Sequence, residues 1–403
     1  MGVLTRKQGD EVVFTGIGKL SIIAFLVAIS SSLVDTIWAV YIDSFVHSEA
    51  IVGLISAGLT LVAFFSFFFF TPIIEKNSKS KIFSYSLLMF GITYALFAIN
   101  SNFYFFVILA FIMTILYTLK ITSFGIIIKD KSPNKVLSRN EGIRYTFMNL
   151  AWVIGPLIAG YVSDKYGISK VFVLGSLFAF LSLLFFKVSS IRDLNVKKKV
   201  ETKVWKNFKE FFVNKDRRTA YVLGGGIALW WSFIYLFIPL EIIRHGLSNM
   251  WIGYFLFGVA IPLIFLEYYF SKLAGKIGSK KMFKLGFLII SVFSFACFFA
   301  SNIYVIMLLL ILASLGAAML EPTVEAYFFD VVRDDKECRF YGPYNTSLDV
   351  YHFIGRFSSA LVLFILPFKF LFLLFGIYMF ALFLYAFKAR NVIESREKNK
   401  RKK

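Results

Sequence analysis

The chain has 403 residues, of which 58% are hydrophobic, and its mean hydropathy is +0.74. Soluble domains of this length are less apolar, so the composition excludes an ordinary soluble protein. The formal net charge of +20 at pH 7 would suit nucleic-acid binding, but the positions of the charges along the chain argue against that class.

Apolar runs of about 20 residues follow one another, and each is long enough to cross a hydrocarbon layer of about 30 Å. Because backbone groups in lipid must bond internally, the runs are predicted to be helices. The first follows a short charged leader, Met1–Glu11, without a small-residue cleavage site, so we expect a retained helix rather than a signal peptide. The twelve predicted spans are residues 18–42, 50–73, 82–99, 103–128, 141–163, 168–188, 219–242, 250–271, 282–300, 303–328, 341–365 and 368–388.

Lys and Arg residues gather on one side of this predicted topology. The exceptions are Lys165, Lys170, Arg244 and Lys369 on the other side, and Lys120 and Arg356 inside spans. Since an excess of Lys and Arg marks cytoplasmic loops, we expect both termini in the cytoplasm of a multi-pass cell-membrane protein. The basic segment 189–218 and the basic tail 398–403 are expected to contact anionic headgroups.

Identical residues recur at a constant offset of 200, which indicates an internal duplication. Among the pairs are Gly53 and Gly253, Gly58 and Gly258, Lys76 and Lys276, Tyr104 and Tyr304, Asp130 and Asp330, Arg139 and Arg339, Gly142 and Gly342, and Gly155 and Gly355. Two like-oriented halves around a cleft are typical of transporters with parallel repeats. We predict an N-terminal six-helix bundle at 1–190, a basic cytoplasmic linker at 191–218, a C-terminal six-helix bundle at 219–390 and a basic cytoplasmic tail at 391–403. The linker is either an amphipathic helix on the membrane surface or a solvated connection.

Residues 71–81 and 271–281 are two copies of one loop pattern. Both resemble the motif G-x-x-x-D-[RK]-x-G-[RK]-[RK] of the major facilitator superfamily. Glu75 stands in place of the motif's Asp, and Gly275 replaces the acid in the second copy. The resemblance covers essentially the whole chain. It implies an all-α membrane protein with the fold of that superfamily, twelve transmembrane helices in two pseudo-symmetric six-helix bundles.

In that family the loop motif forms a cytoplasmic latch that favours the outward-facing state. An acid there can cap a helix N-terminus, and basic residues can pair with acids at helix ends. The alternative is charge that only sets the topology. The residues implied as a latch are Glu75, Lys76, Lys79, Lys276, Lys280, Glu325 and Asp330.

The fifth predicted span carries Gly142, Gly155, Pro156 and Gly160. With alanine at two positions, their spacing resembles the G-x8-G-x3-G-P-x2-G-G signature of family members that exchange drugs or metabolites outward against protons. Small residues let helices approach closely, and a proline bends a helix. An ordinary glycine packing seam explains the pattern equally well.

Asp35 and Lys120 lie within the first and fourth spans. A charge near the bilayer centre costs about 2.5–3.5 kcal/mol on insertion scales, so it normally faces a wet cavity or a partner. Asp35 is a candidate proton carrier, and Lys120 occupies the place of the arginine in the family's fourth-span pattern. The alternative is a structural ion pair or a snorkelling side chain.

Asp349, His352 and Arg356 share one face of the eleventh span, because their spacings are three and four. Glu321, in the tenth span, is a further candidate for a charged lining. Arg356 either binds an anionic group through its planar fork or pairs with Glu321 or Asp349. His352 either joins a proton relay or is a buried neutral residue.

These features predict a secondary transporter that works by alternating access on a small organic solute, with proton coupling and with antiport and efflux slightly favoured. The rivals are an importer or uniporter of a sugar, amino acid or organic anion, and a non-transporting receptor or lipid-handling protein on the same scaffold. Small loops, and the lack of a nucleoside-triphosphate loop or nucleophile–base pair in the sequence, argue against an enzyme or direct ATP drive. We expect a monomer without cofactor, metal or nucleic acid.

Overall fold

A computed structural model describes residues 5–8, 11–14, 16–131, 137–189, 191, 204–332 and 337–393. The chain begins with an antiparallel hairpin of β1 (Thr5–Gln8) and β2 (Glu11–Phe14), in which Thr5 lies opposite Phe14. The sequence predicts only a charged leader, Met1–Glu11, over this stretch. The β-branched and aromatic residues of β2 favour an extended strand, so the all-α expectation holds for the rest of the described chain.

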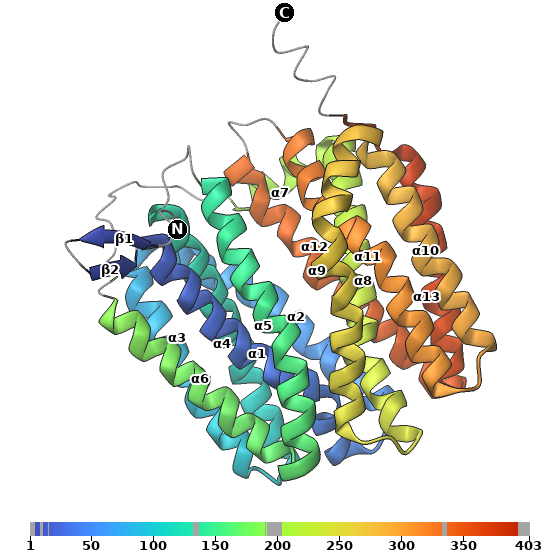
Figure 1. Cartoon of the computed structure of the whole chain (residues 1–403), viewed down its shortest axis with the longest axis horizontal. Coiled ribbons are helices and arrows are strands. Elements are labelled where there is room, and N and C mark those ends of the chain that lie inside the picture. The colour runs from blue at the N-terminus through green and yellow to red at the C-terminus, as the bar shows by residue number, and fades with distance from the viewer. Residues whose placement is uncertain are drawn as a thin grey trace, which may run out of the picture. The chain divides into compact units, whose positions relative to one another are not determined.

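Every element that follows the hairpin is helical among the described residues (Figure 1). The helices are α1 (Gly16–Val46), α2 (Glu49–Lys76), α3 (Lys79–Ile99), α4 (Phe103–Lys131), α5 (Leu137–Tyr166), α6 (Ile168–Val188), α7 (Val204–Val213), α8 (Lys215–Arg244), α9 (Asn249–Ile277), α10 (Ser279–Phe299), α11 (Ile303–Val331), α12 (Glu337–Ile365), α13 (Lys369–Tyr385) and a closing 3-10 helix (Ala386–Lys388). All except α7 and the 3-10 helix contain a stretch long and apolar enough to span a membrane, which gives twelve candidate spans in the described part of the chain. The twelve predicted spans are thereby confirmed.

The helices form two compact units that differ from the two sequence halves at two places. The first unit contains residues 1–45, 62–202 and 248–254, and the second contains 46–61, 203–247 and 255–403. The beginning of α2 therefore belongs with the second unit, and the beginning of α9 belongs with the first. The described helix of the predicted linker, residues 204–213, groups with the second unit.

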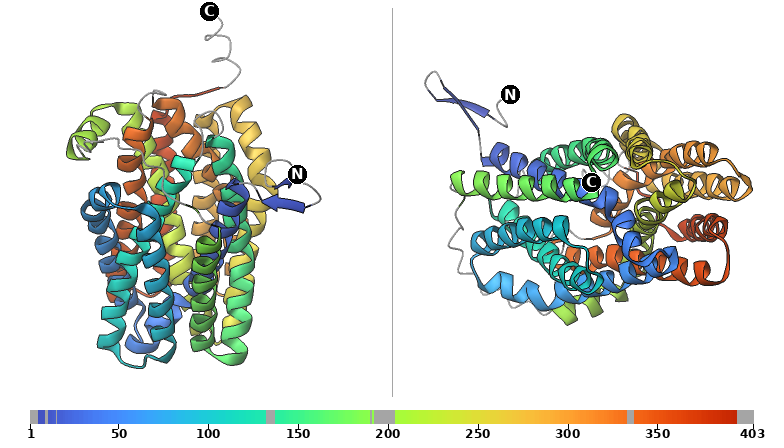
Figure 2. Two further views of the ribbon diagram at one scale, coloured as in Figure 1. Left: turned by 90° about the vertical axis from the view of Figure 1, so that its left-hand side faces the viewer. Right: turned by 90° about the horizontal axis from the view of Figure 1, so that it is seen from below.

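In the first unit, α3 packs against α4 and α6, and in the second, α10 packs in the same way against α11 and α13 (Figure 2). Ser176 Oγ donates to the carbonyl oxygen of Gly91 over 2.8 Å, which joins α6 to α3. Ser291 Oγ donates to the carbonyl oxygen of Gly376 over 2.9 Å, which joins α10 to α13. At the offset of 200, serine and glycine exchange places between the two pairs. The repeat therefore keeps a serine-to-carbonyl hydrogen bond between equivalent helices, but the serine lies on α6 in the first unit and on α10, the equivalent of α3, in the second.

Helix α7 lies within the predicted linker and is attached to the second unit. Its Phe211 side chain is fully buried, with its ring centroid 6.0 Å from that of Phe340 on α12. Glu210 forms an ion pair with Arg339 at 2.6 Å. The described part of the linker is thus a docked helix and not a solvated connection, because one of its faces packs on α12. Residues 192–203 and the basic tail from 394 onward lie outside the described residues.

Candidate functional site

Lys120 lies in the middle of α4 and is 2% exposed. Its ammonium nitrogen donates to Ser31 Oγ on α1 over 3.1 Å and lies 3.7 Å from the centroid of the Phe90 ring on α3. Removing an ammonium from water is costly, and a hydroxyl acceptor and an aromatic face offset only part of that cost. An anionic partner is therefore needed to keep this lysine charged.

Asp35 is an anionic group that acts on Lys120 electrostatically and offsets part of the cost of its burial. It lies one helical turn beyond Ser31 on α1, so both side chains reach the same region of the first unit. Tyr94 on α3 is 1% exposed, forms a hydrogen bond with Ser31 and interacts electrostatically with Asp35. The structure therefore brings Asp35 and Lys120 into one cluster, together with two polar residues that sequence reasoning missed. We call Ser31, Asp35, Tyr94 and Lys120 the α1–α4 cluster.

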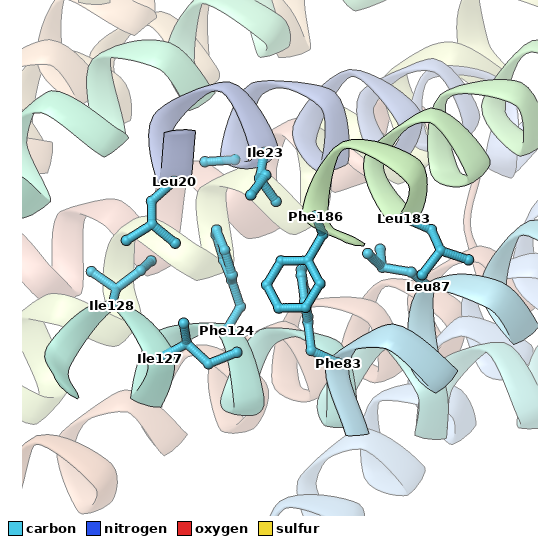
Figure 3. Close-up of a cluster of buried hydrophobic side chains, with 10 residues drawn as sticks. Leu20, Ile23, Phe83, Leu87, Phe124, Ile127, Ile128, Leu183 and Phe186 are labelled. Atoms are coloured by element: carbon cyan, nitrogen blue, oxygen red, sulfur yellow. The ribbon is translucent and has the colours of Figure 1, made fainter. Parts of the chain in front are cut away.

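An apolar plug of buried side chains lies in the first unit, where α1, α3, α4 and α6 meet (Figure 3). Phe124 lies one turn beyond Lys120 on α4 and stacks on Phe83 of α3, with ring centroids 4.8 Å apart and planes 12° apart. The plug is formed by Leu20, Ile23, Ala24, Phe83, Leu87, Phe124, Ile127, Ile128, Leu183 and Phe186. Its side chains come from four helices, so the plug holds α1, α3, α4 and α6 of the first unit together.

Asp349, His352 and Arg356 lie together on α12, as their spacing predicted. Both Asp349 and His352 interact electrostatically with Arg356. The guanidinium of Arg356 also donates to α2, through Nη1 to Thr60 Oγ1 over 2.7 Å and to the Ser56 carbonyl oxygen over 3.3 Å. These hydrogen bonds link α12 to the part of α2 that belongs to the second unit. Sequence reasoning missed this contact, although Ser56 and Thr60 are one turn apart in an apolar helix.

Glu321 on α11 forms a hydrogen bond with Trp231, whereas the sequence suggested Arg356 as its possible partner. Its Oε1 accepts a hydrogen bond from Trp231 Nε1 on α8 over 2.5 Å. The charged groups that act on it most are two further acids, Glu267 and Glu325. Of the two carboxylates considered as partners of Arg356, Asp349 is thus the one that interacts with it.

The implied latch stays a prediction. Its residues Glu75, Lys76 and Lys79 belong to the first unit, and Lys276, Lys280, Glu325 and Asp330 belong to the second. Lys76 and Lys276 are exposed at the ends of α2 and α9, and Lys79 begins α3. Lys280 Nζ donates to the Phe387 carbonyl oxygen over 2.6 Å. Glu325 accepts a hydrogen bond from the Tyr341 hydroxyl over 3.2 Å, Asp330 is exposed near the end of α11, and the surroundings of Glu75 lie outside the described residues.

The second loop copy is also in contact with the C-terminal segment. Gly278 has φ +93°, a conformation that favours glycine, and its α-carbon faces the side chain of Asn391. Ser279 N donates to the Val392 carbonyl oxygen over 3.2 Å, and Val392 N donates back to Ser279 Oγ over 3.3 Å. The chain after the last helix is therefore fastened to the loop between α9 and α10.

The glycine-rich part of α5 lies at two close helix contacts within the first unit. Gly155 lies against Ser32 of α1, so closely that a Cβ would overlap the serine hydroxyl. A Cβ on Gly160 would come 3.0 Å from the α-carbon of Gly253, and the Pro156 carbonyl oxygen faces the same glycine. Gly142 lies in α5, but its surroundings are outside the described residues.

Comparison with known proteins finds matches over most of the chain. A profile of the Major Facilitator Superfamily matches residues 20–266 and 252–403. A relative from Methanocaldococcus jannaschii, named as an uncharacterised MFS-type transporter, is 24% identical over 233 residues, which are 56% of this chain and 60% of the relative. The match thus spans less than two thirds of that relative's length.

Solved structures resemble the chain over nearly its whole length. One is a bacterial homologue of the human lysosomal transporter Spinster, with a TM-score of 0.75 at 12% identity. The alignment covers 92% of this chain and 96% of that protein's chain. Another is a D-xylose–proton symporter, with a TM-score of 0.76 at 10% identity. The alignment covers 94% of this chain and 99% of the symporter chain. At these identities the likeness concerns the fold alone.

Proposed function

The chain belongs to the major facilitator superfamily, whose members are membrane transporters and not enzymes, and we propose that it carries out proton-coupled secondary transport of a small organic solute. The two units alternate access to the solute without a bound cofactor. The observation that carries the proposal is the α1–α4 cluster, in which the buried base Lys120 interacts electrostatically with the half-buried acid Asp35.

The α1–α4 cluster provides a physical link between proton binding and conformation. Lys120 is 2% exposed and depends on the Asp35 carboxylate for charge compensation. Protonation of Asp35 would leave the ammonium with Ser31 and the Phe90 and Tyr117 rings, none of which is charged, and this favours a conformation that opens Lys120 to water. A proton can thereby shift the balance between two states, which is the requirement for coupling.

Outward transport is the direction that we favour. The support is the α5 seam, where Gly155, Pro156 and Gly160 approach neighbouring helices closely, at positions that resemble the signature of family exporters. A tight seam of small residues allows helices to slide or rock past one another. Both termini are assigned to the cytoplasm on the distribution of Lys and Arg, and the protein is taken to act as a monomer.

The test is a solute screen in proteoliposomes that contain a pH-sensitive dye. We expect a transported solute to change the lumenal pH with the wild-type chain and not with Asp35→Asn, because the amide cannot carry the proton. Asp164→Asn is the matched control, since Asp164 is an exposed residue near the end of α5.

The outcomes separate the alternatives. A pH change in the direction of antiport supports the exporter, and one in the direction of symport supports an importer. Solute flux that never moves protons, or proton movement that persists in Asp35→Asn, would contradict the coupling proposal.

A further inference from the structure

The second unit has a polar site of its own, between α8 and α11. Resting on the proposed transport function, we infer that Trp231, Tyr235 and Glu321 recognise an organic cation, such as a substituted ammonium group, as part of the transported solute. The inference concerns the charge of the solute. Proton coupling through the α1–α4 cluster does not specify that charge.

Helix α8 presents one partly exposed stripe on an otherwise buried middle section. Trp231 and Tyr235 are partly exposed and lie one turn apart, with ring centroids 5.7 Å apart and planes at 51°. Their neighbours Trp230 and Phe233 are both fully buried. Two accessible aromatic rings on a buried helix form a surface that a ligand can reach.

Glu321 places a carboxylate at this aromatic pair. Its Oε1 accepts the hydrogen bond from Trp231 Nε1 over 2.5 Å, which fixes the carboxylate beside the indole ring. Within the described residues no Lys or Arg forms an ion pair with Glu321, and its charged neighbours Glu267 and Glu325 are both acids. A partly buried carboxylate in such surroundings is poorly compensated, so a cation bound there is stabilised.

The internal repeat gives a second argument that the group bound at Glu321 is a cation. At the offset of 200, Trp231 and Tyr235 occupy the positions of Ser31 and Asp35. In the first unit those positions serve the ammonium of Lys120, so a base from the chain itself completes the site. In the second unit aromatic rings and a carboxylate occupy the equivalent place without such a base among the described residues. The missing positive charge is therefore assigned to the solute.

Carboxylate and aromatic ring together select for substituted ammonium groups. An ammonium over a Trp or Tyr face gains about 0.5–2 kcal/mol, and the larger values apply when water is excluded. A cation that carries alkyl groups is also easier to remove from water than a bare ammonium or a metal ion. The site therefore fits an organic cation better than an inorganic one.

The experiment measures binding, in the absence of any gradient, of radiolabelled tetramethyl-, tetraethyl- and tetrapropylammonium to the full-length chain in phosphatidylcholine nanodiscs. We expect at least one probe to bind, and Glu321→Gln to weaken it by about tenfold or more, since the charged acceptor is lost. Trp231→Phe should weaken it by about three- to tenfold, because the ring remains while the hydrogen bond to the carboxylate is lost.

Two variants serve as controls. Trp230→Phe removes the same kind of indole N–H from the adjacent residue, where Nε1 donates to no acceptor among the described residues, and should change affinity by less than about twofold. Glu267→Gln removes a nearby negative charge without touching Trp231 and should have a smaller effect than Glu321→Gln. Each variant is first checked for a monodisperse elution profile, so that misfolding is not read as lost binding.

The result that overturns the inference is binding of none of the three probes, or equal binding to the wild-type chain and Glu321→Gln. Failure of the coupling proposal looks different. In that case cations still bind in a manner that requires Glu321, while Asp35→Asn leaves proton movement unchanged in the proteoliposome assay.

Discussion

Gly253 lies against the main chain of Pro156, such that a Cβ on this glycine would come 2.6 Å from the Pro156 carbonyl oxygen. The relationship recurs 200 residues earlier, where a Cβ on Gly53 would come 3.3 Å from the Arg356 carbonyl oxygen. Each of the two glycines lies near the start of its helix, α9 or α2, in the short segment that groups with the other half's unit. The glycines therefore allow α9 to contact α5 and α2 to contact α12 through their backbones.

Gly253→Ala is expected to destabilise the protein by about 1–3 kcal/mol, since backbone atoms at this distance cannot move aside as a flexible side chain can. The measurement is thermal unfolding of the purified chain in detergent. Gly58→Ala is the control, because nothing lies within 4 Å of a Cβ at that position. There the substitution should stabilise α2 by up to about 1 kcal/mol. Equal stability of wild type and Gly253→Ala would contradict the close backbone contact.

The electrostatic interaction between Asp35 and Lys120 in the α1–α4 cluster leads to a non-additive pair of substitutions. Lys120→Met leaves the Asp35 carboxylate without its cation and should cost about 3–5 kcal/mol. Adding Asp35→Asn removes the uncompensated charge, so the double variant should be more stable than Lys120→Met alone. Thermal unfolding of the two single variants and the double variant gives the coupling directly. Simple additivity of the two changes would show that the two charges do not interact.

The helices could be predicted from the sequence because length and hydropathy alone decide whether a segment can cross a bilayer. The chemistry of the site was predicted only where a residue carries a charge. Asp35 and Lys120 stand out in apolar helices, but Ser31 and Tyr94 are common in such helices and show their role only once α1, α3 and α4 are packed. Trp231 is the same kind of case, since its hydrogen bond to Glu321 depends on helix rotation.

The repeat gave the correspondence of positions but not the partners. Gly53 and Gly253 were paired from the sequence, yet nothing in the sequence states which helix each one faces. The same holds for Lys280, whose hydrogen bond to the carbonyl oxygen of Phe387 could not be predicted from the sequence. Contacts to backbone carbonyls leave no mark in residue identity, because every residue has one.

Thr60→Val tests the connection between α2 and α12. The substitution keeps the shape of the side chain and removes the hydroxyl that accepts from Arg356 Nη1 over 2.7 Å. A hydrogen bond to a charged group contributes about 1.5–3 kcal/mol, so the variant should unfold at lower temperature. If Arg356 serves this connection alone, the KM for the solute stays unchanged in Thr60→Val. A large rise in KM with unaltered thermal stability would instead place Arg356 in the solute site.

The docked state of α7 can be followed by limited proteolysis with trypsin. Phe211 is fully buried on α7, and truncating a buried Phe to Ala typically costs about 3–5 kcal/mol, more than a helix of 10 residues can lose and stay attached. Phe211→Ala should therefore speed cleavage after Lys206 and Lys209, which lie within α7. Val213→Ala is the control, since Val213 is 75% exposed.

The ion pair between α7 and α12 allows a second, independent check by exchange of charges. Glu210 and Arg339 lie 2.6 Å apart and are each about one-third exposed, so reversing one charge should speed cleavage of α7 only modestly. Chymotrypsin, which cleaves after aromatic residues such as Trp205 and Phe208, replaces trypsin here, because Glu210→Arg would itself add a trypsin site. Glu210→Arg alone places two cations together and loosens α7. Combining it with Arg339→Glu restores an attractive pair and should return the cleavage rate toward the wild-type value. If the combined variant is cleaved faster than either single variant, α7 is held by its apolar face and the ion pair contributes nothing to docking.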